Sequence, residues 1–328
     1  MSKVSVIIPI YGVEKYIERC ARSLFEQTLD DIEYIFVNDC TKDKSINILT
    51  QTLEDYPKRK EQVTIVNHPY NKGLPQARKT GIMLARGEYI IHCDSDDWVD
   101  TKAYENMWQI AKSNDYDIIF CDYYNSDGIN HHNNHIKMCL NKSEATLDII
   151  KNMSWTLWRA MVKQTLYNNY IIYPTENNGE DFALMCQLLH YSNKIHHIKI
   201  PYYYYFNNSN SISNQPSIES FFDRIEQHKR NIIVLEKFYA DKQVNRSNEI
   251  IILKLIAIAK IYSFDKKLRN KKYCSNLFPE IEKEFIFLNI QIPINLKIIY
   301  YEMKYNLHNT FNYMRKVKSV FKRIKIFQ

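Results

Sequence analysis

Glycine is scarce in this chain: there are 6 among 328 residues, about 2%, against about 7% in average proteins. They are Gly12, Gly73, Gly81, Gly87, Gly128 and Gly179, and none follows Gly179. No two glycines have the G-x-G-x-x-G spacing of dinucleotide-binding folds or the G-x-x-x-x-G-K-[ST] spacing of P-loops. The sequence therefore excludes a site in which a glycine-rich loop cradles phosphates with backbone N–H groups.

Cysteine pairs and long apolar runs are also missing. The 7 cysteines include no C-x-x-C pair, which favours free thiols in a reducing compartment over a disulfide framework. The N-terminal apolar run is too short for a signal peptide. The longest late apolar stretch, Ile250 to Tyr262, is interrupted by Lys254 and Lys260 and is too short to span a bilayer. We therefore expect a cytoplasmic protein without a transmembrane helix.

Charge is divided unevenly along the chain. Residues 1–200 contain 22 Lys and Arg against 26 Asp and Glu, whereas residues 201–328 contain 22 against 11. An acidic first part and a basic second part suggest different partners for the two parts. The acidic part would repel a polyanion and no nucleic-acid motif is present, so we expect no nucleic-acid partner.

The first 120 residues alternate between apolar β-branched runs and segments with helical spacing. Strands are expected at Val4–Ile10, Glu33–Asp39, Gln62–His68, Glu88–Asp94 and Asp117–Tyr123. Helices are expected at 14–27, 43–55, 74–85 and 102–112. This order predicts an α/β fold with a Rossmann-like, mainly parallel sheet flanked by helices.

Acidic residues follow two of these strands. Asp39 ends the second, and Asp94, Asp96 and Asp97 follow the fourth in the sequence HCDSDDW. Ligands bind at the carboxyl ends of strands in parallel sheets, and clustered carboxylates repel one another unless a cation is present. Oxygen ligands of this kind suit Mg²⁺ or Mn²⁺. The alternative is an acidic turn or helix cap, above all for Asp97 and Asp100.

Five segments, in order, resemble family-2 glycosyltransferases of the GT-A fold: SVIIPIYGVEKYIERCARSLFEQTL, IFVNDCTKDKS, NKGLPQARKTGIMLARGEYI, CDSDDW and GEDFALMCQLL. The resemblance implies transfer of a sugar, with inversion, from a nucleotide-sugar donor, usually a UDP-sugar, to an acceptor hydroxyl, with a divalent metal. It implies a catalytic domain over residues 1–213. Residues 214–328 are then expected to form a helical, basic C-terminal extension.

The resemblance also implies roles for individual residues. The nucleotide would be held by Pro9, Tyr11, Asp39, Arg78, Asp94 and Ser95. Asp96, with Asp94, would ligate Mn²⁺ or Mg²⁺ bound to the diphosphate. For Arg78 an ion pair that fixes its helix remains an equal alternative.

Catalysis would fall to Asp181 in the sequence GED, which matches the general base of the family. Glu180, Trp155 and Trp158 are candidates for the acceptor site. Asp181 has a helix cap as its alternative role, and each tryptophan has a place in the core.

Two residues depart from the family pattern. Asn38 precedes Asp39 where the family has a second acid, and Phe206 stands where Arg is common, although Ser211 and Ile212 still match. These departures leave open an alternative function, a catalytically degenerate scaffold that binds a nucleotide or glycan at the membrane surface.

The tail combines apolar residues at helical spacing with basic ones, and no acid follows Glu302. Its apolar positions are Leu307, Phe311, Met314, Val317, Phe321 and Ile324. A peripheral helix on an anionic membrane, at the inner face of the cell membrane, is one interpretation. A helix packed on its own domain or in a homodimer is the other. With the resemblance, this suggests a glycan or lipid-linked acceptor in bacterial capsule, lipopolysaccharide or exopolysaccharide synthesis.

Overall fold

The structure is a computed structural model that describes residues 2–136, 138–207, 217–265, 272, 276–284 and 286–305. The chain separates into two compact units, Met1–Phe238 and Tyr239–Gln328. Ser211, Ile212 and the basic tail at 307–325 lie outside the described residues. The expected domain boundary between residues 213 and 214 stays a prediction.

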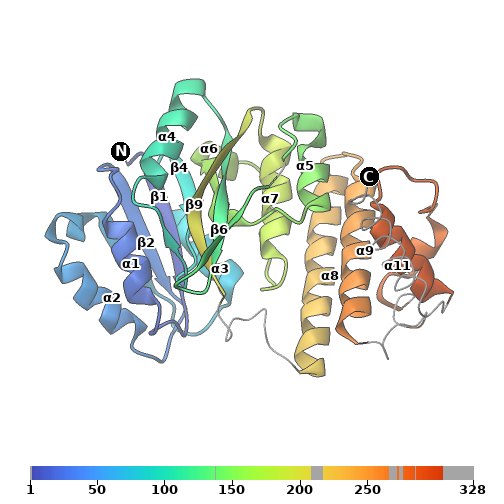
Figure 1. Cartoon of the computed structure of the whole chain (residues 1–328), viewed down its shortest axis with the longest axis horizontal. Coiled ribbons are helices and arrows are strands. Elements are labelled where there is room, and N and C mark those ends of the chain that lie inside the picture. The colour runs from blue at the N-terminus through green and yellow to red at the C-terminus, as the bar shows by residue number, and fades with distance from the viewer. Residues whose placement is uncertain are drawn as a thin grey trace, which may run out of the picture. The chain divides into compact units, whose positions relative to one another are not determined.

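The first unit is built on one sheet (Figure 1). Its strands are β1 (Val4–Ile10), β2 (Ile32–Asn38), β3 (Val63–Asn67), β4 (Tyr89–His92), β5 (Trp98–Val99), β6 (Ile118–Ser126), β7 (His131–Asn134), β8 (Ala160–Lys163) and β9 (Ile195–Phe206). Their order across the sheet is β3-β2-β1-β4-β8-β6-β9-β5, and β7 pairs with β6.

The first four strands in sequence order pair only in parallel with one another. β1 pairs in parallel with β2 and β4, and β2 with β3, so Ile10, Asn38 and Asn67 lie in register at the carboxyl edge. All seven residues of β1 are buried, as its continuous apolar run predicts for a strand covered on both faces. The predicted parallel pairing is therefore confirmed for the first four strands, and Asp39 and Asp94 follow strands that end at one edge.

Beyond β4 antiparallel pairs join the sheet. β8 pairs antiparallel with β4 and β6, and the two-residue β5 pairs antiparallel with β9. β6 and β9 pair in parallel with an irregularity near Asp122. Through this arrangement β9 returns to the segment that follows β4.

Helices flank the sheet. In the first unit they are α1 (Ile17–Phe25), α2 (Ser45–Glu54), α3 (Leu74–Leu84), α4 (Ala103–Asn114), α5 (Lys142–Lys151), α6 (Gln164–Tyr167), α7 (Glu180–Tyr191) and most of α8 (Ile218–Asp241). Short 3₁₀ turns η1 (Pro57–Gln62) and η2 (Leu157–Arg159) join them. The expected α/β architecture with flanking helices is confirmed.

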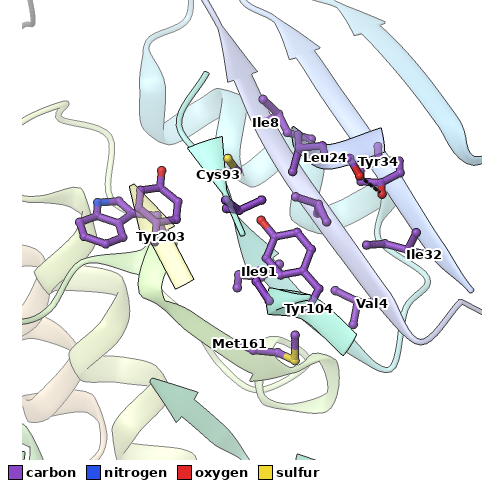
Figure 2. Packing of buried hydrophobic residues seen from close by; sticks show 14 of the residues in the cluster. Val4, Ile8, Leu24, Ile32, Tyr34, Ile91, Cys93, Tyr104, Met161 and Tyr203 are labelled. Atoms are coloured by element: carbon purple, nitrogen blue, oxygen red, sulfur yellow. Dashed lines mark hydrogen bonds between the residues drawn. The ribbon is translucent and has the colours of Figure 1, made fainter. Parts of the chain in front are cut away.

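Alternate residues of β1 pack against different helices. Val4 and Ile8 belong to one buried cluster with Leu24 of α1 and Tyr104 of α4 (Figure 2). Ile7 points to the other face, where a Cβ on Gly81 of α3 would come within 2.4 Å of its Cγ2. This close approach explains why one of the few glycines lies in the middle of a helix.

The second unit is helical over its described residues. It contains α9 (Ser247–Phe264), the 3₁₀ turn η5 (Pro279–Lys283) and α11 (Ile294–Lys304). The hydroxyl of Tyr262 donates to Glu302, and Lys254 pairs with Glu280 at 2.5 Å. Within the described part of the chain, none of the helices has both the length and the apolar character needed to cross a membrane.

Candidate active site

The four residues after Cys93 divide into two accessible and two buried side chains. Asp94 and Asp96 are partly exposed, whereas Ser95 and Asp97 are buried. The backbone N–H of Asp97 donates to the carbonyl oxygen of Asp94 at 3.1 Å, which closes a turn. The turn therefore offers a ligand from solvent the carboxylates of Asp94 and Asp96.

Asp97 fixes this turn to β9. Its carboxylate accepts hydrogen bonds from the hydroxyl of Tyr203 at 2.6 Å and the backbone N–H of Phe206 at 2.7 Å. The Tyr203 hydroxyl in turn accepts from the backbone N–H of Asp94 at 3.0 Å. Burial, with the charges of Asp96 and Asp94, raises the pKa of Asp97 well above its usual value. Asp97 is thus a structural acid, and Asp100 accepts from the N–H of Lys102 at the start of α4.

Arg78 of α3 connects this turn to the start of α7. The side chain is 4% exposed, and its Nη2 donates to Asp94 Oδ1 at 2.8 Å. Its Nε lies 3.4 Å from Glu180 Oε1. Burial lowers the pKa of Arg78, but the charges of Asp94, Glu180 and Asp181 outweigh burial and the pKa rises. Three candidate site carboxylates therefore act on one buried guanidinium.

Glu180 and Asp181 begin α7 but have different surroundings. Glu180 is buried, and burial together with the charge of Asp181 raises its pKa to about 8, although Arg78 opposes this rise. Asp181 is partly exposed, and its Oδ1 accepts from the backbone N–H of Phe182 at 2.8 Å. Burial and the neighbouring negative charge therefore favour the protonated form of Glu180, and Asp181 is the carboxylate that a substrate can reach.

Asp39 follows β2 at the carboxyl edge, with β1 between β2 and β4, and is 3% exposed. Its carboxylate accepts from the backbone N–H groups of Lys72 and Gly73, each at 2.8 Å, and lies 2.7 Å from His68 Nδ1. The other ring nitrogen of His68 bonds Thr80 at 2.9 Å. Asp39 therefore fixes the loop that leads into α3, a role that its strand-end position did not reveal.

The remaining candidate residues of the nucleotide site lie at the end of β1. Pro9 is buried in the strand, whereas Tyr11 is 54% exposed directly after it. Asn38, the departure from the family pattern, accepts from the backbone N–H of Thr41 at 2.9 Å and donates to Asn67 at 2.8 Å. The oxygen and the nitrogen of the Asn38 amide are therefore both hydrogen-bonded at this edge of the sheet.

The two tryptophans occupy different places. Trp155 packs edge-on against Phe182 of α7, next to Asp181, with ring centroids 5.6 Å apart. Trp158 stacks on Tyr203 at 4.3 Å and belongs to the main buried cluster. Both rings are buried. Trp158 supports the Asp94 turn indirectly, because it stacks on Tyr203, whose hydroxyl bonds the turn.

Two neighbours of the site were not found from the sequence. Arg19 of α1 donates to the carbonyl oxygen of Asp96 at 2.9 Å, and its guanidinium lies over the rings of Trp98 and Phe206. Phe206, where the family often has Arg, thus has a guanidinium against its ring. Arg19 lies within the first of the five segments, but nothing in that segment indicates a contact with the turn at Asp96, so only the fold could identify it.

His92 is the second neighbour of the site that was not found from the sequence. It is 1% exposed at the end of β4, and neither ring nitrogen has a hydrogen-bond partner among the residues that the structure describes. Burial and the charge of Arg78 lower its pKa well below the usual value, which makes it a neutral neighbour of the acidic residues. A histidine in an otherwise apolar strand was the signal available in the sequence.

The donor set at the turn is consistent with a divalent cation shared with a substrate. In the ranges described, no group of three or more His, Cys, Asp and Glu side chains could hold a metal by itself. Asp94 and Asp96 offer two oxygen ligands, and Mg²⁺ and Mn²⁺ commonly take one or two carboxylates together with substrate phosphates. The residues present therefore fit a cation whose remaining ligands are a diphosphate and water.

Comparisons with known proteins agree with this arrangement. The family model "Glycosyl transferase family 2" matches residues 5–190. The chain is 31% identical over 246 residues to the uncharacterized glycosyltransferase EpsJ of Bacillus subtilis, a match that covers 72% of this chain and 70% of EpsJ. It is 39% identical over 119 residues to poly(ribitol-phosphate) beta-glucosyltransferase of Bacillus spizizenii, covering 35% of this chain and 18% of the relative.

The fold is also similar to a solved structure. S. aureus TarS, residues 1–349 in complex with UDP-GlcNAc, superimposes with a TM-score of 0.60 at 17% identity. The match covers 94% of this chain and 92% of the TarS chain. This likeness supports the expected GT-A fold.

Proposed function

The chain belongs to glycosyl transferase family 2, and we propose that it transfers a sugar from a UDP-sugar to an acceptor hydroxyl with inversion. The observation that carries this proposal is the contact of Arg78 with both Asp94 and Glu180. It joins the acids of the proposed donor site to the turn that carries the proposed base. Both halves of a transfer reaction would then meet at one place on the carboxyl edge.

On the donor side, we assign Asp94 and Asp96 to a Mn²⁺ or Mg²⁺ ion. Such an ion would offset the negative charge that develops on the leaving diphosphate. Asp97 and Tyr203 hold the turn in place, and Arg19 fixes the carbonyl oxygen of Asp96. These contacts hold the turn that carries the two accessible carboxylates without the help of a ligand.

The nucleotide would lie along the edge formed by β1, β2 and β3. Tyr11 is exposed there, and Pro9 lies in the preceding strand. Asp39 already accepts several hydrogen bonds, so we expect it to shape the site through the loop at 71–73. Ser95 would lie beside the phosphates. Arg78 would act on the phosphate site indirectly, through its hydrogen bond to Asp94.

On the acceptor side, Asp181 would remove the proton of the attacking hydroxyl. It is accessible, and a base on a separate helix can approach the sugar opposite the leaving diphosphate, as inversion requires. The raised pKa of Glu180 favours its protonated form, which would orient the acceptor by donating a hydrogen bond. Trp155, which packs against Phe182, would border the acceptor site. Trp158 would act indirectly, through its stack on Tyr203.

The relatives suggest the biological setting. One of them is by name a poly(ribitol-phosphate) beta-glucosyltransferase of a bacterium, and the TarS structure is a complex with UDP-GlcNAc. We propose that this chain acts in bacterial capsule, lipopolysaccharide or exopolysaccharide synthesis, on a glycan or lipid-linked acceptor. The basic tail would keep it at the inner face of the cell membrane.

The test is release of UDP from a panel of UDP-sugars with Mn²⁺, comparing the wild type with Asp96→Ala and Asp181→Asn. We expect both variants to lose at least about 99% of turnover, because Asp96 would hold the ion that offsets the charge of the leaving diphosphate and Asp181 would accept the proton of the attacking hydroxyl. Full activity in both would refute the site. UDP binding by calorimetry without turnover of any donor would instead favour a catalytically degenerate scaffold.

A further inference from the structure

The turn before α7, residues 176–179, is bonded on two sides to parts of the chain far away in the sequence. The turn has the sequence Glu-Asn-Asn-Gly and leads directly into Glu180 and Asp181. Figure 1 shows α7 lying between the sheet and α8. Gly179 has φ +92, and a Cβ there would meet Phe182 at 2.3 Å and His228 of α8 at 3.1 Å. The turn thus has little room to shift toward α8.

On one side α8 binds the backbone of the turn. Nδ2 of Asn231 donates to the carbonyl oxygens of Glu176 at 2.9 Å and Asn178 at 3.0 Å. Gln227 accepts from the backbone N–H of Asn178 at 3.1 Å. Asn231 is fully buried, so both of its hydrogen bonds are shielded from water.

On the other side the turn binds the loop that Asp39 holds. Oδ1 of Asn177 accepts from the backbone N–H of Leu74, the first residue of α3, at 3.0 Å. The preceding N–H, that of Gly73, donates to Asp39. A Cβ on Gly73 would lie 2.8 Å from Asn177 Oδ1, so glycine permits this approach.

From these contacts we infer that Asn177 and Asn231 are positioning residues that set the height and direction of Asp181 relative to the donor site. Asn231 holds the turn to α8, and Asn177 holds it to the loop at the nucleotide edge. α8 therefore contributes to the placement of the proposed base, although it lies beyond residue 213, the expected end of the catalytic domain. The inference rests on the proposed function, since it assigns these residues to the placement of the base.

The experiment uses the full chain and follows UDP release from a UDP-sugar with Mn²⁺. Asn231→Asp keeps the shape of the side chain but replaces the donating NH₂, and Asn177→Ala removes the acceptor for Leu74. We expect each to lower kcat by about tenfold or more, while the KM for the donor changes by less than about twofold. Hydrogen exchange at residues 176–183 should accelerate in both variants.

Matched variants separate positioning from a general loss of structure. Asn177→Asp keeps a side-chain oxygen that can accept from the N–H of Leu74, and should retain most of the kcat that Asn177→Ala loses. Glu226→Gln changes an exposed residue of α8 and should leave both kinetic constants unchanged. If Asn231→Asp does not fold, the comparison of the two Asn177 variants decides.

The outcomes also distinguish this inference from the proposed function. Wild-type kcat in Asn231→Asp and Asn177→Ala, together with a large loss in Asp181→Asn, would overturn the positioning role alone. An equal loss in Asn177→Asp and Asn177→Ala would overturn it as well. Full turnover in Asp181→Asn would instead refute the base assignment on which the inference rests.

Discussion

The Nη2 of Arg78 donates a 2.8 Å hydrogen bond to Oδ1 of Asp94, sixteen positions further along the chain. The guanidinium is almost entirely buried, whereas the carboxylate is 28% exposed. A buried cation therefore holds one oxygen of an accessible acid. The same cation lies close to Glu180, so its removal would affect both ends of the site.

We therefore predict that Arg78→Ala lowers the free energy of unfolding by about 3–5 kcal/mol, because the substitution removes a buried side chain that pairs with Asp94 and lies against the buried Glu180. Urea unfolding at pH 7 measures the loss. Arg78→Lys keeps a charge without the two-sided geometry and should fall between the wild type and Arg78→Ala. A free energy of unfolding for Arg78→Ala within about 0.5 kcal/mol of the wild type would contradict the role of this contact.

The pKa of Glu180 predicts a pH dependence of stability. Its folded pKa is raised to about 8, so the folded state binds a proton that the unfolded state has released. The stability due to this group is complete below pH about 4.5 and is lost as pH rises toward 8. The glutamine of Glu180→Gln has no ionisable group. The free energy of unfolding of this variant should therefore rise relative to the wild type by up to about 1.4 kcal/mol per pH unit in that range.

Urea unfolding of the wild type and Glu180→Gln at pH 5.5, 6.5, 7.5 and 8.5 tests this prediction. The two stability curves should diverge with rising pH, in favour of the variant. Parallel curves would show that Glu180 is ionised throughout.

Asp96 and Asp97 are neighbours with opposite expected behaviour. Asp97→Asn should lower the free energy of unfolding by about 1–3 kcal/mol, since one of its two donors then faces an NH₂ group. Asp96→Asn should leave the unfolding free energy within about 0.5 kcal/mol of the wild type but abolish the turnover that Mn²⁺ supports. Thermal unfolding and a Mn²⁺ titration of UDP release measure both, and the reverse pattern would exchange the two roles.

Gly81 predicts a packing effect. Gly81→Ala brings a Cβ against Ile7, and overpacking of this kind costs about 1–3 kcal/mol. Met83→Ala, at a 70% exposed position of the same helix, is the control and should change stability by less than about 0.5 kcal/mol. Equal stability of both variants would mean that α3 moves away from β1 at no cost.

Much of the fold could be predicted from local pattern. The continuous apolar run of Val4–Ile10 specifies a strand buried on both faces, and helical spacing over 74–85 specifies α3. Since parallel strands end at one edge, the shared position of Asp39 and Asp94 follows from the order of these elements. The antiparallel pairing of β9 with β5 could not be predicted from local pattern, because it joins residues more than a hundred positions apart in the sequence.

The sequence by itself determined the alternation of strands and helices, the acids at the carboxyl edge and the absence of a glycine-rich phosphate loop. Only the tertiary structure decided which acids a ligand can reach. Asp96 and Asp97 are adjacent and chemically equal, yet β9 buries one with two donors and leaves the other accessible. Burial and hydrogen bonding come from contacts between distant segments, and these contacts set the charge and access of each carboxylate.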